Sequence, residues 1–285
     1  MIRLSLSLIA LLTTHTLATT ELLLTTPPDY SFTSSQSLTI RGYTPATTQM
    51  IQINSTQYPV ASPSFHIDHP LSIGKNHLKI RAIGPDNTLL SQTIRHVISK
   101  QSFTDISDLP NEIKIQIEDL ATMNHFSIST PEFKPNSPIS RVELAQFLTA
   151  TMRHNTIDTQ QITDIPSHHP AYHAVNTAIQ KNMMSLYEQN RFKPYRYVTR
   201  AEGIVSLLRF AAPLIHNPPV TKPYRDVPTT HWAATQIKTA QSLGWIPNSD
   251  TFNPDGYLTR ADLVQITTKM PIFKFRINQH YQWQQ

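Results

Sequence analysis

Phe252–Leu263 reads FNPDGYLTRADL, and two variants of this phrase precede it in the chain. They are FKPNSPISRVEL at Phe133–Leu144 and FKPYRYVTRAEG at Phe192–Gly203. In all three copies the first Phe and the Arg stand eight positions apart. Such constant spacing indicates one supersecondary unit that is repeated three times.

A helix is predicted before each phrase. In copy three the apolar residues recur at roughly helical spacing, at Trp232, Ile237, Ala240 and Leu243. Gly244 then suits a left-handed helix stop, and we place Asn182 and His125 in the same slot of copies two and one. An Asp opens each unit, and we expect its carboxylate to fix the first turn by bonding nearby amides. These acids are Asp105, Asp164 and Asp226.

A second helix is predicted at the end of each phrase. Ser140-x-x-Glu143 and Thr199-x-x-Glu202 have the pattern of capping boxes, in which hydroxyl and acid each bond an amide of the first turn. Thr259-x-x-Asp262 keeps an acid in that turn. Each unit is therefore expected to be a helix, a loop and a second helix.

These features resemble the S-layer homology (SLH) family over about Phe103–Met270. Copy three is most similar, with YRDV, His231-Trp232-Ala233, Gly244, FNP and LTRAD. Copy two has Pro170 in place of the Trp, and copy one lacks the Trp and has SRVE for TRAE. The resemblance implies an all-α, pseudo-threefold bundle of three helical hairpins. It also implies that grooves between neighbouring repeats hold an anionic cell-wall glycan.

The first half of the chain is predicted to be a β domain. Apolar and polar residues alternate in Ser37–Arg41, Gln49–Asn54 and His77–Ala82, which is typical of strands. The string from Leu24 to Val97 resembles a bacterial Ig-like module, so we expect a β-sandwich. A spacer role is the first expectation for it, and binding of a glycan or a protein is the alternative. We expect Val97–Ser102 to be a linker.

The predicted fold class is therefore multidomain β plus α. The expected bounds are 1–18 for a signal peptide, 22–100 for the Ig-like domain, 103–156, 162–215 and 222–270 for three SLH repeats, and 271–285 for a tail. For the tail we expect loose packing against the last repeat, with an extra strand as the alternative.

The N-terminus and the composition predict a secreted, cell-envelope protein. Met1–Ala18 combines Arg3, the apolar run Leu4–Leu12 and small residues at Thr16 and Ala18, the pattern of a cleaved signal peptide. No later stretch is long and apolar enough for a membrane span. The 285 residues include no cysteine, which excludes disulfides and thiol catalysis. The net charge of +5 suits an acidic polymer, and export argues against nucleic acid.

The repeated phrase contains one arginine in each copy, Arg141, Arg200 and Arg260, which we call the phrase arginines. They are the strongest candidate ligand-binding residues. A guanidinium matches a carboxylate bidentately, and the resemblance implies contact with an acidic sugar substituent such as a pyruvyl ketal. The alternative is an ion pair with an acid of a neighbouring repeat. We rank Arg200 and Arg260 above Arg141, because copy one departs furthest from the motif. Trp232 is a further candidate for stacking on a sugar, although we expect it to be core.

Catalytic, metal and cofactor sites are not predicted. No HExxH, GxSxG, Walker or dinucleotide-binding motif occurs. His169 and His173 are expected four apart on one helix next to His168, but no acid at matching spacing completes a zinc site. The prediction is a non-enzymatic anchor for a cell-wall polysaccharide or peptidoglycan-linked polymer. The alternative is an envelope adhesin or assembly protein that binds another protein through its β domain.

Overall fold

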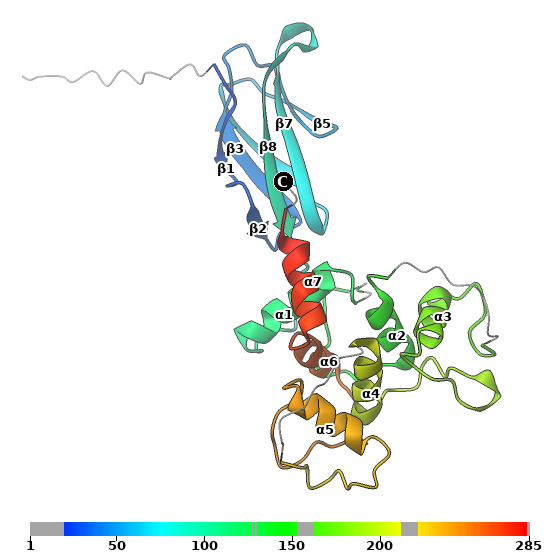
Figure 1. Ribbon diagram of the computed structural model, residues 1–285. Helices are drawn as coiled ribbons and strands as arrows, with labels where there is room; N and C mark the ends of the chain where they lie inside the picture. The colour runs from blue at the N-terminus through cyan, green and yellow to red at the C-terminus, as the bar shows by residue number, and fades with distance from the viewer. Residues whose placement is uncertain (1–19, 127, 129, 153–161, 212–221, 284–285) are drawn as a thin grey trace, which may run out of the picture. The chain divides into compact units, whose positions relative to one another are not determined.

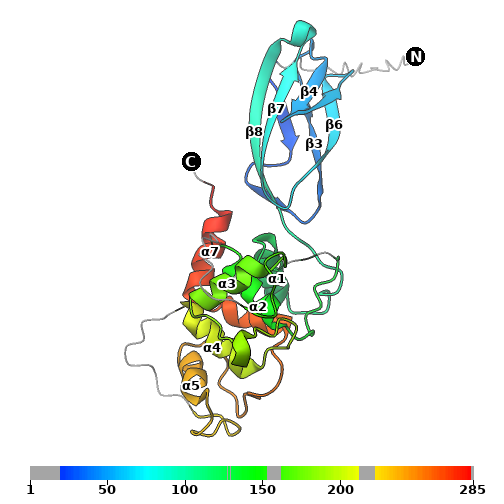
Figure 2. The same ribbon diagram turned by 90° about the vertical axis from the view of Figure 1, so that its right-hand side faces the viewer.

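The computed structural model describes residues 20–126, 128, 130–152, 162–211 and 222–283. The predicted signal peptide, Met1–Ala18, lies outside these residues. The chain divides between Ser99 and Lys100 into two compact units. Strands form the first unit and helices the second, as the expected order of β and α requires (Figures 1 and 2).

Two sheets build the first unit. One has the order β1-β3-β6 and the other the order β2-β8-β7-β4-β5, with β2 and β8 parallel. The strands are β1 (Leu23–Thr26), β2 (Ser31–Thr33), β3 (Ser37–Tyr43), β4 (Met50–Ile53), β5 (Thr56–Pro59), β6 (Ser64–Pro70), β7 (Gly74–Ile83) and β8 (Leu89–Ser99).

The predicted alternation decides which side chains enter the core of this unit. Ile40 from one sheet and Ile51 and Ile80 from the other are fully buried in one shared cluster. This confirms strands in the three predicted segments. The predicted linker is wrong in its first half, because β8 continues to Ser99 and Val97 is buried in the core.

The second unit contains a helix pair around each copy of the phrase. The pairs are α1 (Asn111–Thr122) with α2 (Arg141–Thr149), α3 (Tyr172–Gln180) with α4 (Arg200–Ala211), and α5 (Ala234–Ser242) with α6 (Arg260–Thr267). The pairs contact one another in a closed order, since α2 contacts α3, α4 contacts α5 and α6 contacts α1. One hydrophobic core joins all three.

The first helix of each pair ends as predicted in copies two and three, where Asn182 and Gly244 have positive φ. The prediction for copy one is wrong by one residue, because Asn124 has the positive φ and His125 is buried. The His125 ring lies against Phe147 and Phe273, and its Nδ1 is 3.0 Å from the Phe147 carbonyl oxygen. Burial lowers the pKa of His125 to about 4, so the ring is neutral.

The predicted loose or extended tail is also wrong. Pro271–Tyr281 forms helix α7, and Pro271 suits its first turn because that position needs no amide donor. Phe273 is fully buried against Phe147 and Phe210, whereas Phe275 is 63% exposed. The apolar residues at 273 and 277 fit both an alternating strand and a helix face, and the aromatic site in the core selects the helix.

Candidate functional site

The loop of each phrase is held by the Asp that opens the unit. Both oxygens of Asp226 accept backbone amides, from Phe252 at 2.8 Å and from Asn253 at 2.6 Å. Asp105 and Asp164 bond the equivalent amides of copies one and two. The middle residue of every Phe-x-Pro has positive φ, at Lys134, Lys193 and Asn253. The acids were expected to bond nearby amides, but their partners lie more than 25 residues later in the chain.

The capping motifs then start the second helices. Ser140 and Glu143 exchange both bonds of a capping box, as predicted, and Thr199 and Glu202 do the same. Thr259 and Asp262 also form the complete box, although only an acid in the first turn was expected there, because Asp has a shorter side chain than Glu. Each phrase arginine is therefore placed at the first residue of a rigid helix.

Each phrase arginine packs against the Phe of a neighbouring copy. Its Nε donates to the carbonyl oxygen of that Phe, and its guanidinium lies over the Phe ring at 4.6–4.9 Å. The Nε–O distances are 2.7 Å for Arg141–Phe192, 2.9 Å for Arg200–Phe252 and 2.7 Å for Arg260–Phe133. One edge of every guanidinium thus holds the protein together and is not available to a ligand.

The outer edges of the three guanidinium groups differ. Arg200 forms an ion pair with Asp262 at 3.0 Å, and Arg260 forms one with Glu143 at 3.1 Å. In the third interface, Glu202 instead binds Arg196 at 2.7 Å and accepts a bond from the Tyr187 hydroxyl. The alternative of an ion pair with a neighbouring copy therefore holds for Arg200 and Arg260.

Arg141 lies in a more cationic setting than its two counterparts. Its terminal NH2 donates to the Ser185 carbonyl at 2.6 Å, and its guanidinium lies over the Tyr187 ring. Burial lowers the pKa of Arg141, but a guanidinium remains charged at any physiological pH. The exposed Arg209 reaches the same place from α4, where its NH1 donates to the Ser185 hydroxyl at 2.9 Å.

A hollow of about 180 Å³ lies beside Arg141. It is lined by Arg141, Met184, Ser185, Leu186, Tyr187, Glu202, Val205, Ser206, Arg209 and Trp232. Trp232 is 61% exposed, so the expectation that it belongs to the core is wrong. Trp245 is the buried indole of copy three, because it follows Gly244 directly and enters the core at the helix stop.

A second hollow of about 200 Å³ lies beside Arg260. Its lining includes Glu132, Lys134, Pro138, Glu143 and Arg260. Glu143 and Arg260 neutralise each other across it. A hollow thus lies next to Arg141 and another next to Arg260, and the one at Arg141 has the larger excess of positive charge.

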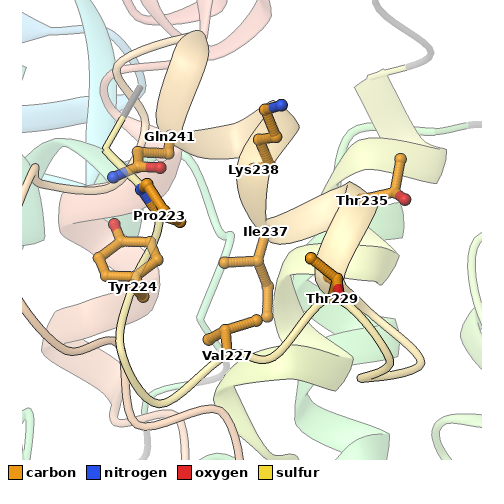
Figure 3. A pocket seen from close by; sticks show the side chains of 9 residues that line it. Pro223, Tyr224, Val227, Thr229, Thr235, Ile237, Lys238 and Gln241 are labelled. Atoms are coloured by element: carbon orange, nitrogen blue, oxygen red, sulfur yellow. The ribbon is translucent and has the colours of Figure 1, made fainter. Parts of the chain in front are cut away.

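A larger hollow, of about 410 Å³, lies against α5, and none of the phrase arginines is among its lining residues (Figure 3). Val227 and Ile237 give it an apolar floor. Its polar side chains Tyr224 and Gln241 already bond the backbone of Pro247 and Lys222. Thr229, Thr235 and Lys238 are its other polar lining residues, and Lys238 is the charged one among them, so this hollow concentrates less positive charge than the one at Arg141.

In copy two, the side chain of His169 stabilises the turn before α3. His169 lies before α3 rather than on it, so the expected helical pair with His173 is wrong. Its Nδ1 accepts the amide of Ala171, as His231 does for Ala233 at the same 3.1 Å. In the part of the chain that the structure describes, no three His, Cys, Asp or Glu side chains are grouped to hold a metal ion.

Two segments of the chain match the model of a known protein family. The model of the family described as S-layer homology domain matches residues 161–202 and 223–264. These two segments are similar to S-layer homology domains. The matched segments contain copies two and three of the phrase, and copy one precedes them. The recognition of the family from these two copies is confirmed.

A known surface protein has a related segment. Cell surface glycoprotein 1 of Acetivibrio thermocellus is 36% identical to this chain over 83 residues. The alignment covers 28% of this chain and 4% of that protein. Within the described residues, no helix combines the length and apolar character needed to cross a membrane.

Sequence reasoning missed two functional residues of the Arg141 hollow, Tyr187 and Arg209, and also Arg196, which bonds the Tyr187 hydroxyl from outside it. Tyr187 lies in a loop, and Arg209 lies on α4 nine residues after Arg200. The sequence signal for Arg209 was its place outside the apolar pattern of that helix. Nothing in the sequence indicated that Tyr187 would lie over Arg141, since the two belong to different copies.

Proposed function

We propose that this protein is exported and anchored in the cell envelope through three S-layer homology repeats. The repeats bind an anionic cell-wall polysaccharide or a peptidoglycan-linked polymer and do not turn it over. Copy one completes the set of three repeats. Like the two matched copies, it has an Asp that bonds the phrase loop, a capping box and an arginine that bonds the Phe of a neighbouring copy. Three weak sites on one polymer raise the overall affinity through effective concentration.

The proposed architecture is a pseudo-threefold bundle preceded by an Ig-like sandwich. The closed order of helix contacts supports the bundle, because each repeat then meets the other two in equivalent ways. Two sheets around one core support the sandwich. Its proposed role is to act as a spacer between the bundle and the rest of the envelope.

The hollow at Arg141 carries the proposal. Arg141 and Arg209 bring two positive charges to it, and the carboxylate among its lining residues, Glu202, is already bound by Arg196. A sugar carboxylate in the hollow would gain charge-assisted hydrogen bonds in partly sheltered surroundings, where they are stronger than in water. The exposed ring of Trp232 offers an apolar face to the same sugar.

This geometry changes the ranking of the arginines. Arg200 and Arg260 are largely neutralised by Asp262 and Glu143, so an anion would have to compete with an ion pair at 3.0–3.1 Å. Among the described residues, the hydrogen-bond partners of Arg141 are the carbonyl oxygens of Phe192 and Ser185, and no carboxylate lies within ion-pair distance of it. We therefore place the strongest anion site at Arg141, although its copy departs furthest from the family motif.

Co-sedimentation of the purified chain with wall sacculi tests this function. Arg209→Ala is the first variant, because Arg209 is exposed and its removal leaves the packing of Arg141 intact. Trp232→Ala is the second. Arg225→Ala is the matched control, since Arg225 is an exposed arginine that pairs with Asp250 outside the hollow. Both test variants should bind at least about fivefold more weakly, while the control binds as the wild type does.

Chemical removal of the acidic polymer from the sacculi is the complementary measurement. Binding should then be lost for the wild-type chain. If stripped sacculi still bind it fully, the polymer is not the ligand. In that case a protein partner of the β domain becomes the better explanation.

A further inference from the structure

Three backbone segments meet at one point of the second unit, which we call the junction and define by Ile139, Val198 and Leu258. The amide of Ile139 donates to the Leu258 carbonyl, that of Leu258 to Val198 and that of Val198 to Ile139, at 2.9–3.0 Å. The three side chains are almost completely buried. The junction therefore links the backbones of all three copies by hydrogen bonds.

The residue before each member of the junction has the opposite orientation. These residues are Pro138, Tyr197 and Tyr257, and each forms a β-bridge with a neighbouring copy, to Thr259, Ser140 and Thr199 respectively. Successive side chains of extended backbone point to opposite sides. Because the junction side chains are buried, Pro138, Tyr197 and Tyr257 face outward.

The two tyrosines expose large ring surfaces. Tyr197 is 47% exposed and Tyr257 is 57% exposed, and their ring centroids are 5.5 Å apart at an angle of 63°. The bridges use the backbone alone, so the fold does not require an aromatic side chain at either position. Neighbouring exposed aromatic rings with no packing role indicate a contact surface.

This surface is connected to both hollows beside the phrase arginines, directly at one and through a neighbouring residue at the other. Pro138 lines the hollow at Arg260. On the other side, Arg196 precedes Tyr197 in the chain and donates to the Tyr187 hydroxyl, which belongs to the hollow at Arg141, at 2.6 Å. A polymer that occupied both hollows would be guided over the tyrosines.

We propose that Tyr197, Tyr257 and Pro138 form a stacking platform for a sugar ring of the wall polysaccharide. This inference rests on the proposed function of the hollows and adds a site between them. An aromatic face packs well against the C–H face of a sugar, and the tyrosine hydroxyls keep the surface wettable. The platform itself has no charge, so it binds the polymer through its rings and makes one chain bridge two anion sites.

The test measures affinity against polymer length. Wall polymer is released from sacculi, cut and separated into fragments of increasing length, and each fraction is titrated calorimetrically. The full chain should gain affinity as the fragments become long enough to leave one hollow and cross the platform. The Tyr197→Ala/Tyr257→Ala double variant should bind the shortest fragments as the wild type does. It should bind the longest about tenfold more weakly, since each ring contact is worth up to roughly that factor.

Two controls separate stacking from other effects. Tyr197→Phe/Tyr257→Phe keeps both rings and should retain the gain with length. Tyr43→Ala removes a tyrosine that is also 47% exposed but lies in β3, and it should change nothing. If the double alanine variant melts early, the single variants Tyr197→Thr and Tyr257→Thr replace it, because a β-branched residue suits the bridge backbone.

The outcomes distinguish a failure of the proposed platform from a failure of the proposed function. If the wild-type chain binds no fragment of any length, the proposed function fails and the platform with it. If the alanine and wild-type chains bind every length equally, the platform is refuted while the hollows remain binding sites. Equal weakening at all lengths in a folded variant also refutes it, because the rings would then belong to a hollow.

Discussion

Arg260 donates from Nε to the carbonyl oxygen of Phe133, a residue 127 positions earlier in the chain. The same guanidinium stacks on the Phe133 ring at 4.7 Å and pairs with Glu143. This contact connects the last copy of the phrase to the first, as Arg141–Phe192 and Arg200–Phe252 connect the others. The phrase arginine is thus a structural link as well as a candidate ligand contact.

Arg260→Ala should lower the free energy of unfolding of the helical unit by about 2–4 kcal/mol, because a buried carbonyl and a carboxylate lose their partner together. Urea unfolding followed by circular dichroism measures the change. The exposed control Arg225→Ala should stay within about 0.5 kcal/mol of the wild type. Equal midpoints for the two variants would contradict a structural role for Arg260.

Thr199→Ala should cost about 1 kcal/mol of stability through the loss of an N-cap. The Thr199 hydroxyl accepts the Glu202 amide at 3.2 Å, and alanine leaves that amide without its partner. Thr235→Ala, at an exposed position of α5, is the control and should be neutral or slightly stabilising. Sacculus binding at low temperature should be normal for both. A loss of binding at unchanged stability would assign Thr199 to the ligand instead.

Phe273→Ala should destabilise the helical unit by about 3–5 kcal/mol, because it opens a cavity between Phe147 and Phe210. Phe275→Ala is the matched control on the exposed side of α7. A fragment that ends at Met270 should melt well below one that ends at Trp283, by thermal denaturation. Equal melting temperatures would show that the repeats need nothing from α7.

Asp226→Asn should reduce the dependence of stability on pH in the acid range. Burial would raise the pKa of Asp226, but the amides of Phe252 and Asn253 outweigh it and lower the pKa. A carboxyl with a lowered folded pKa contributes stability above its unfolded pKa, which is about 3.9, and loses it as the pH falls through the folded value. Urea midpoints between about pH 6 and pH 2 measure this. Asp255→Asn is the matched control, because it replaces an exposed carboxyl of the same loop.

Local chemistry allowed the repeated elements to be predicted. The capping boxes at Ser140, Thr199 and Thr259 are contacts over three residues, so the sequence contains both partners in a readable pattern. The same holds for the strand alternation around Ile51 and Ile53, where burial follows from period two. Errors arose where patterns were ambiguous, as in α7, or where one residue of register mattered, as at Asn124 and His125.

The sequence by itself determined that one helical unit occurs three times behind a β domain, and that each copy places an arginine at the start of a helix. Only the tertiary structure decided which arginine keeps an excess of positive charge and which indole is exposed. The physical reason is that Arg141, Glu202, Arg209 and Trp232 come from different copies. Their net field depends on which arginine each carboxylate pairs with in the folded chain. Asp262 and Glu143 pair across interfaces with Arg200 and Arg260, whereas Glu202 pairs within its own copy with Arg196, and the repeated phrase does not encode that difference.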